Sequence, residues 1–253
     1  AHGFADVAIL ARRRLVGSSC TSGMHLQVRP LGAAKKQPFL TPLERYMTAT
    51  TPLAQETALL LIDPYNDFLS ENGKLQGRAK AVMDQVGTIE HMKAVVAGCR
   101  AAGIPVFYVP HNRSRPSDFS HWAFPTPYQL GGHRISLFAE GSWGAEWHPD
   151  FQPKPEDIIV KEHRNSSGFA NTDLDVQLRQ HGIRRLILVG MLANTCLETT
   201  GKFGVELGYH VTLVRDATAA FSPQAMEVAH EINGPTYAHA IVTTAELLSS
   251  LSS

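Results

Sequence analysis

Three strand ends in this sequence carry side chains that together could perform nucleophilic and acid–base chemistry. Cys196 follows the apolar run 185–190, where a buried strand is expected to turn into a helix. The N–H groups at a helix start favour a thiolate, so the sequence predicts a lowered cysteine pKa. Asp63 and Lys161 each close another apolar run. A thiol, a carboxylate and an amine match a nucleophile, a proton acceptor and a cation.

Each of these residues, taken alone, also has a purely structural interpretation. Cys196 could be a small buried hydrophobe, Asp63 a cap for the next segment, and Lys161 a solvated strand end. The three residues together favour a shared site, because ligands of open parallel sheets bind outside the carboxyl ends of the strands.

The elements that must position these side chains alternate from residue 57 onward, as in a doubly wound, Rossmann-like α/β fold. The expected strands cover residues 57–63, 104–109, 157–161, 185–190, 210–214 and 238–242. The expected helices cover 78–102, 172–181 and 195–207, with one more starting at Ser222-Pro223 and a last one capped by Thr243 and Glu246.

Composition narrows the class of ligand. The 253 residues are 43% hydrophobic, which favours one large α/β core. Lys plus Arg and Asp plus Glu number 23 each, so no strong field attracts nucleic acid or a membrane surface, and we expect a small-molecule ligand. Three cysteines favour a reducing, cytoplasmic location. The twelve histidines form no metal-binding pattern, and we predict no metal and no cofactor.

Two regions stand apart from this pattern. Residues 1–50 are basic, and we predict that they form a poorly structured extension, a transit peptide that targets an organelle, or a subunit-contacting arm. The main α/β domain is then expected at 51–253. Another alternative is that this region includes sequence upstream of a true start at Met24 or Met47. The proline-rich segment 110–155 is expected to wall the crevice and select the substrate, with a packing or subunit-contact role as the alternative.

Three motifs in this order resemble the isochorismatase-like cysteine hydrolases, a family that includes nicotinamidases and amidohydrolases of N-carbamoylsarcosine and ureidoacrylate. The motifs are Leu61-Ile62-Asp63-x-x-Asn66-Asp67-Phe68, Lys161 with Ser167-Gly168-Phe169, and Gly190-x-x-x-Asn194-x-Cys196. The resemblance covers about residues 55–250 and implies a three-layer α/β/α sandwich around a six-stranded parallel sheet. It also implies a homodimer or homotetramer.

The resemblance further implies roles for individual residues. Asp63, Lys161 and Cys196 match the catalytic Asp, Lys and Cys of the family. The backbone N–H groups of Leu192 and Cys196 would form the oxyanion hole, with a cis peptide bond between Met191 and Leu192. This set indicates a cysteine hydrolase that cleaves an amide, ureido or carbamoyl C–N bond of a small molecule through a thioester. The alternatives are an isochorismatase-type enol ether hydrolase and a noncatalytic binding protein on the same fold.

The chain also departs from the family pattern. The Asp-x-His pair that holds the nicotinamidase metal is replaced by a segment with a lone His111, which we interpret as a hydrogen-bonding or substrate residue. His163 or Arg164 could meet a substrate carboxylate. The substrate-binding candidates are Tyr65, Phe68, His111, Trp143, His163 and Phe169, with core packing or solvent exposure as the alternative for each.

Overall fold

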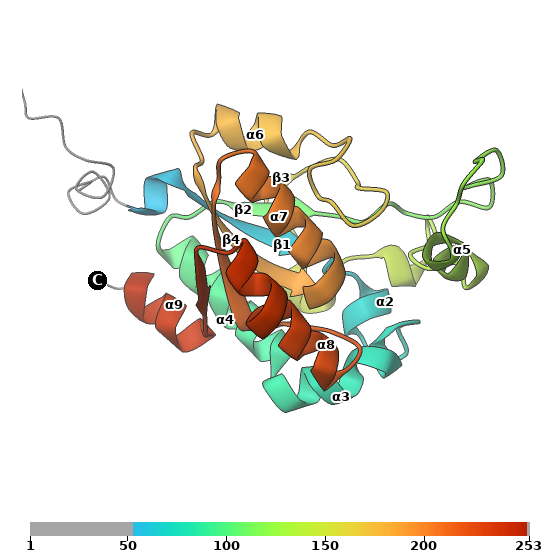
Figure 1. Cartoon of the computed structure of the whole chain (residues 1–253), viewed down its shortest axis with the longest axis horizontal. Helices are drawn as coiled ribbons and strands as arrows, with labels where there is room; N and C mark the ends of the chain where they lie inside the picture. The colour runs from blue at the N-terminus through green and yellow to red at the C-terminus, as the bar shows by residue number, and fades with distance from the viewer. Residues whose placement is uncertain (1–52, 252–253) are drawn as a thin grey trace, which may run out of the picture. The chain divides into compact units, whose positions relative to one another are not determined.

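Six parallel strands form one sheet in the computed structural model, which describes residues 53–251 (Figure 1). The sheet order is β3-β2-β1-β4-β5-β6. The strands are β1 (Thr57–Ile62), β2 (Val106–Val109), β3 (Ile158–Ile159), β4 (Arg185–Met191), β5 (His210–Ala219) and β6 (Ala240–Val242). The predicted α/β class and six-stranded parallel sheet are confirmed. The predicted extension at 1–50 lies outside the described residues.

Helices cover both faces of the sheet (Figure 1). The α-helices are α2 (Asn66–Leu69), α3 (Gln76–Val86), α4 (Thr88–Ala101), α5 (Pro127–Arg134), α6 (Leu174–Gln180), α7 (Glu198–Glu206), α8 (Pro223–Glu227) and α9 (Thr244–Leu251). The 3₁₀- and π-helical turns are η1 (Leu53–Glu56), η2 (Trp143–Ala145), η3 (Pro149–Phe151), η4 (Ala193–Leu197), η5 (Val228–Asn233) and η6 (Gly234–Thr236). Within residues 53–251, every helix is too short or too polar to cross a lipid bilayer.

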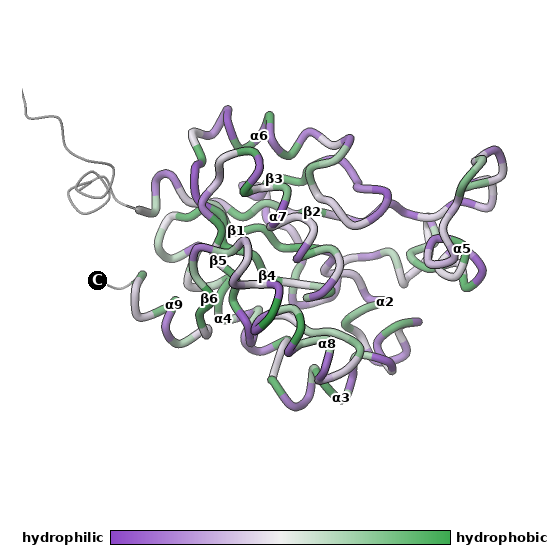
Figure 2. Tube along the Cα trace, viewed as in Figure 1, coloured by the Kyte–Doolittle hydropathy of each residue, from purple (hydrophilic) through white to green (hydrophobic). Residues whose placement is uncertain are grey.

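The central strand β1 is a continuous apolar run because both of its faces are buried. Leu59 and Leu61 pack into the core cluster that includes residues of α3 and α4, whereas Leu60 and Ile62 pack into the cluster that includes residues of α6. Side chains of a strand alternate between the two faces of the sheet, and here both faces are covered. The hydrophobic colour therefore concentrates along the strands in Figure 2.

The structure corrects some predicted boundaries. The expected helix 78–102 is two helices, because Gly87 adopts a left-handed conformation (φ 70°) and ends α3. Strand β5 continues past the predicted 210–214, beyond an irregularity in its pairing with β4. The predicted Ser222 cap is confirmed, since its hydroxyl accepts a hydrogen bond from the Ala225 N–H.

The long segment between β2 and β3 is held down at one buried carboxylate. Asp67, on α2, accepts hydrogen bonds from the backbone N–H of Phe138 (2.8 Å) and of Lys74 (3.1 Å). Helix α5 has no buried residue and projects away from the sheet and its covering helices (Figure 1). The segment is therefore anchored near α2 and exposed at α5.

Gly190 is required where β4 passes β1. Its φ is +116°, and a Cβ atom at this position would lie 2.1 Å from the Ile62 carbonyl oxygen. We expect Gly190→Ala to lower the free energy of unfolding by about 3 kcal/mol or more, because both the backbone conformation and the contact oppose a side chain. Urea titration measures this change. The exposed helical Gly77, whose Cβ would meet nothing within 4 Å, is the control, and a Gly190→Ala protein as stable as Gly77→Ala would contradict this account.

Candidate active site

Asp63 lies directly after β1, at the carboxyl end of the sheet. Its backbone is left-handed (φ 51°), and its N–H donates to the Val109 carbonyl of the neighbouring strand (3.2 Å). The side chain is fully buried. One carboxylate oxygen, Oδ2, has no hydrogen-bond partner among the described residues. Because a buried acceptor without a partner is costly, this oxygen marks a position where a proton or a substrate group can bind.

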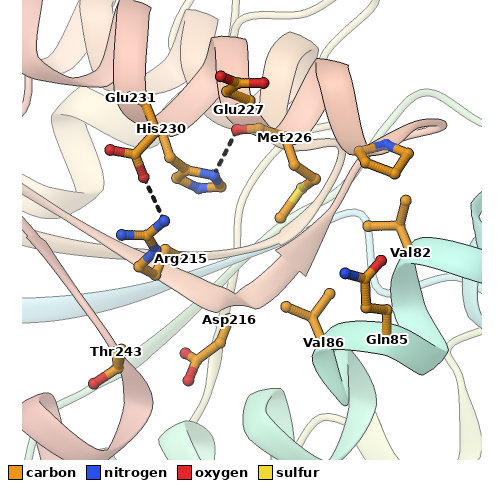
Figure 3. A pocket seen from close by; sticks show the side chains of 11 residues that line it. Val82, Gln85, Val86, Arg215, Asp216, Met226, Glu227, His230, Glu231 and Thr243 are labelled. Carbon is orange, nitrogen blue, oxygen red and sulfur yellow. Dashed lines mark hydrogen bonds and ion pairs between the residues drawn. The ribbon is translucent and has the colours of Figure 1, made fainter.

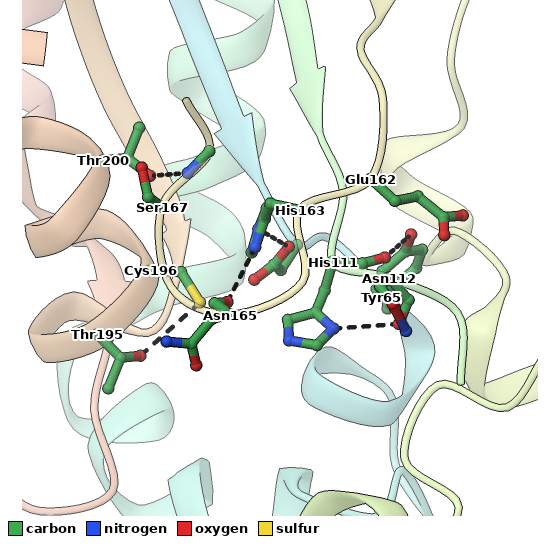
Figure 4. A network of polar contacts seen from close by, with 12 residues as sticks. Tyr65, His111, Asn112, Glu162, His163, Asn165, Ser167, Thr195, Cys196 and Thr200 are labelled. Atoms are coloured by element: carbon green, nitrogen blue, oxygen red, sulfur yellow. Dashed lines mark hydrogen bonds and ion pairs between the residues drawn. The ribbon is translucent and has the colours of Figure 1, made fainter. Parts of the chain in front are cut away.

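His163 is the direct partner of Asp63 (Figure 4). Its Nε2 lies 3.1 Å from Asp63 Oδ1, and its Nδ1 lies 3.0 Å from the Asn165 carbonyl oxygen. A carbonyl oxygen can only accept, so Nδ1 carries a proton. A second proton must lie between Nε2 and the carboxylate, since both would otherwise be acceptors. The buried pair therefore resembles an imidazolium beside a carboxylate.

Cys196 completes this cluster from the other side (Figure 4). It lies in η4, the turn that follows β4, and its Sγ, a ring nitrogen of His163 and a carboxylate oxygen of Asp63 all lie within 4.8 Å of one another. The Thr195 hydroxyl contacts Sγ at 3.9 Å. The structure thus brings the predicted thiol and carboxylate together and adds an imidazole.

The prediction of a lowered thiol pKa is wrong. Burial is the largest effect and raises the pKa of Cys196 well above its ordinary value, and the negative charge of Asp63 raises it further. Hydrogen bonds from Thr195 and from the Leu192 backbone act in the opposite direction and are outweighed. The resting side chain is therefore a neutral thiol, which needs a base beside it before it can attack.

The structure also corrects the expected place of Lys161. Strand β3 is an edge strand, and its last pair with β2 is Ile159 with Tyr108. The next paired residues are His163 and His111, and the segment between the two pairs is one residue longer on the β3 side. This extra residue breaks the regular alternation of side chains. Lys161 is exposed, and its backbone N–H donates to the Asp173 carboxylate (2.7 Å). His163, two residues later, is the side chain that reaches Asp63.

The turn that carries the thiol has the backbone geometry that the resemblance implies. The peptide bond between Met191 and Leu192 is cis. The Leu192 carbonyl accepts from the N–H groups of Thr195 and Leu197, both at 3.2 Å. A hydrogen bond from the Leu192 backbone to the thiol lowers the pKa of Cys196. The oxyanion role of the Leu192 and Cys196 N–H groups stays a prediction.

The other substrate-binding candidates lie in different surroundings. Tyr65 is fully buried, and its hydroxyl donates to the His111 carbonyl (3.0 Å). Phe68 packs on Phe138 in the core beneath the site. Phe169 stacks with Phe203 and Tyr209 within or beside the core cluster that α6 covers. Trp143 is 48% exposed. His111 lies beside the cluster, with its ring 5.1 Å from that of His163.

A cavity lies beside His163, although Asp63, His163 and Cys196 do not themselves line it. Its lining includes His111 and Asn165, both of which contact His163, together with Arg164 and Tyr128. Tyr128 is 56% exposed, and desolvation of its hydroxyl together with the charges of Cys196 and Asp63 raises its pKa. Sequence analysis missed Tyr128, since its position on the projecting α5 is a matter of tertiary structure.

A larger cavity of about 350 Å³ lies between α3, β5 and α8 (Figure 3). It combines apolar side chains such as Val86 and Met226 with an Arg215–Glu231 ion pair. None of Asp63, His163 and Cys196 lines it. We therefore assign the chemistry to the cluster at the strand ends, where the reactive groups are.

The three clustered side chains are also of the kinds that bind zinc. Both ring nitrogens of His163 are already engaged, however, one by Asp63 and one by the Asn165 carbonyl. Zinc binding would require Nε2 to be deprotonated and turned away from the carboxylate. We therefore interpret the cluster as a site of proton transfer.

Fold and site together define an α/β protein with a buried thiol, carboxylate and imidazole at the carboxyl end of a parallel sheet. The family model described as Isochorismatase domain matches residues 57–246. The chain belongs to this family.

Individual relatives agree with this assignment. The chain is 31% identical over 193 residues to the ureidoacrylate amidohydrolase RutB of Pantoea ananatis, covering 72% of this chain and 77% of that one. A cysteine hydrolase from Pseudomonas syringae pv. phaseolicola is similar in structure, with a TM-score of 0.65 and 28% identity over 79% of this chain and 93% of that one. The N-carbamoylsarcosine amidase of Thermoplasma acidophilum has a TM-score of 0.55 and 27% identity, over 75% and 96%.

Proposed function

We propose that the protein is a cysteine hydrolase that cleaves a C–N bond of a small ureido, carbamoyl or amide compound. The observation that carries this proposal is the position of Cys196 Sγ within 4.8 Å of the Asp63 carboxylate, one oxygen of which is buried with no hydrogen-bond partner within residues 53–251. The relatives named as a ureidoacrylate amidohydrolase and an N-carbamoylsarcosine amidase support the substrate class.

The first half of the reaction forms a thioester. Asp63 Oδ2 accepts the thiol proton while Cys196 Sγ attacks the substrate carbonyl carbon. The N–H groups of Leu192 and Cys196 stabilise the oxyanion of the tetrahedral intermediate. When the intermediate collapses, the C–N bond breaks and Asp63 returns its proton to the leaving nitrogen.

The second half restores the free enzyme. A water molecule attacks the thioester carbonyl while Asp63 accepts its proton, and the departing thiolate regains a proton from Asp63. The products are an amine or ammonia and the corresponding acid. If the terminal C–N bond breaks, ammonia leaves directly and the N-substituted carbamate decomposes to an amine and carbon dioxide. If the other C–N bond breaks, the amine leaves and unsubstituted carbamate decomposes to ammonia and carbon dioxide, so ureido and carbamoyl substrates release ammonia in both cases.

The cavity beside His163 supports recognition of a carboxylate on the substrate. Arg164 lines this cavity, and its guanidinium is held by a weak contact with Asp118 (3.5 Å) that leaves the side chain 59% exposed. A guanidinium with free donors is suited to a carboxylate. The homodimer or homotetramer, the cytoplasmic location and the lack of nucleic-acid and membrane partners stay predictions within this proposal.

Ammonia release from a substrate panel tests the proposed function. The panel contains 3-ureidoacrylate, N-carbamoylsarcosine, the same N-carbamoyl acid as its methyl ester, nicotinamide and isochorismate, with enol ether cleavage followed separately. We expect ammonia from the ureido and carbamoyl compounds, with kcat/KM at least about tenfold higher for the free acid than for its ester, since a lost charged hydrogen bond costs about 1.5–3 kcal/mol. Cleavage of isochorismate alone would overturn the proposal.

A further inference from the structure

We propose that His163 is the cation of this active site, in the place that the family resemblance assigns to Lys161. The inference rests on the proposed hydrolase function and deepens it, because it identifies the third chemical group and the pH range in which that group works. A cation is needed beside Asp63 and Cys196, since moving the thiol proton to the carboxylate creates a buried thiolate.

Geometry separates the two candidates for this role. His163 is fully buried, its Nε2 contacts Asp63 at 3.1 Å, and a ring nitrogen lies within 4.8 Å of Cys196 Sγ. Lys161 is exposed beyond the end of the edge strand β3. A positive charge in water is screened, whereas a buried charge in contact acts at low dielectric. Of these two residues, His163 is the one placed to stabilise a thiolate at Cys196.

The hydrogen bonds keep His163 protonated. Burial is the largest single effect and lowers the pKa of His163, but the charge of Asp63, its hydrogen bond and the Asn165 carbonyl together outweigh burial and raise it. Both N–H groups of the ring then have acceptors. These contacts therefore favour the imidazolium form of His163.

The remaining groups around His163 do not supply a competing cation. His111 packs edge-on against the ring, and burial lowers its pKa, so it stays neutral. Glu162 adds a raising effect on the His163 pKa. Arg113 is held by that same Glu162 through a 2.6 Å contact. Asp63 is negative, Cys196 and His111 are neutral, and Arg113 is paired with Glu162. The ring of His163 therefore carries the positive charge beside the thiol.

Histidine and lysine at this position would lose their positive charge at different pH values. The imidazolium is fully present below its raised pKa and is lost as the pH rises through it, whereas a lysine keeps its charge to about pH 10.4 when unperturbed. Hydrolysis should therefore decline on the alkaline side through loss of the His163 proton. His163→Lys should move this decline to higher pH.

Alkylation of Cys196 by iodoacetamide tests the inference without a substrate. The full chain and the variants His163→Gln, His163→Lys and Lys161→Gln are labelled at pH 7, and peptide mass spectrometry separates Cys196 from Cys99 and Cys20. We expect His163→Gln to slow Cys196 labelling at least about tenfold, as one unit of thiol pKa implies. His163→Lys should recover most of the rate, and Lys161→Gln should match the wild type. Slow labelling in Lys161→Gln with normal labelling in His163→Gln would overturn the inference.

Hydrolysis and NMR complete the test. On an active substrate, the alkaline decline should shift upward in His163→Lys and stay in place in Lys161→Gln. An unchanged decline in His163→Lys contradicts the inference, whereas equal ammonia release by wild type and Cys196→Ala would contradict the proposed function instead.

If a His163 variant fails to fold, histidine proton NMR of the wild type tests the inference in its place. Among the ring signals that shift on Cys196 alkylation, one should titrate above pH 6.5, and its absence overturns the inference.

Discussion

Replacing Cys196 with alanine is expected to abolish ammonia release, lowering kcat/KM at least about 10³-fold, because no thioester can form without the nucleophile. The variant should fold normally, since it loses one small buried atom. The test measures ammonia release from one active substrate. Far-ultraviolet circular dichroism checks that the variant folds.

Cys99 provides the matched control for this experiment. It is also a buried free cysteine, and burial raises the pKa of its thiol to about 12, but it lies in α4 within the core. Cys99→Ala should retain turnover. Enol ether cleavage that survives in Cys196→Ala would instead favour the isochorismatase alternative, because protonation of an enol ether needs an acid and no thiol.

Replacing Asp63 with asparagine is expected to reduce turnover at least about 10³-fold and also to lower stability by about 2–4 kcal/mol. The amide cannot accept the thiol proton. It also leaves the buried ring of His163, 3.1 Å away, without a compensating negative charge. Ammonia release and urea unfolding measure the two effects separately.

Asp84 provides the control for Asp63. It forms an ion pair with Lys80 at 2.8 Å, but its side chain is 61% exposed. Asp84→Asn should therefore leave both turnover and unfolding unchanged within error, as is usual for surface pairs. Full activity in Asp63→Asn would show that another group accepts the thiol proton and would remove Asp63 from the mechanism.

Local patterns were sufficient for most of the framework. The apolar runs predicted the strands because both faces of a parallel sheet are covered, as Leu59 and Leu60 show on opposite sides of β1. The Ser222 cap was readable because a capping hydrogen bond joins residues a few positions apart. The break at Gly87 was missed, since apolar spacing continues through a helix end that only the glycine conformation reveals.

The positions of the thiol and the carboxylate could be predicted from local sequence, because Asp63 directly follows β1 and Cys196 lies in the turn after β4, and both strands are recognisable by their residues. The contact between Asp63 and His163, two residues beyond Lys161, depends on tertiary structure, because an extra residue at an edge strand changes which side chain turns inward. It also reversed the expected direction of the Cys196 pKa. Desolvation depends on every atom packed around the sulfur, and no local pattern reports it.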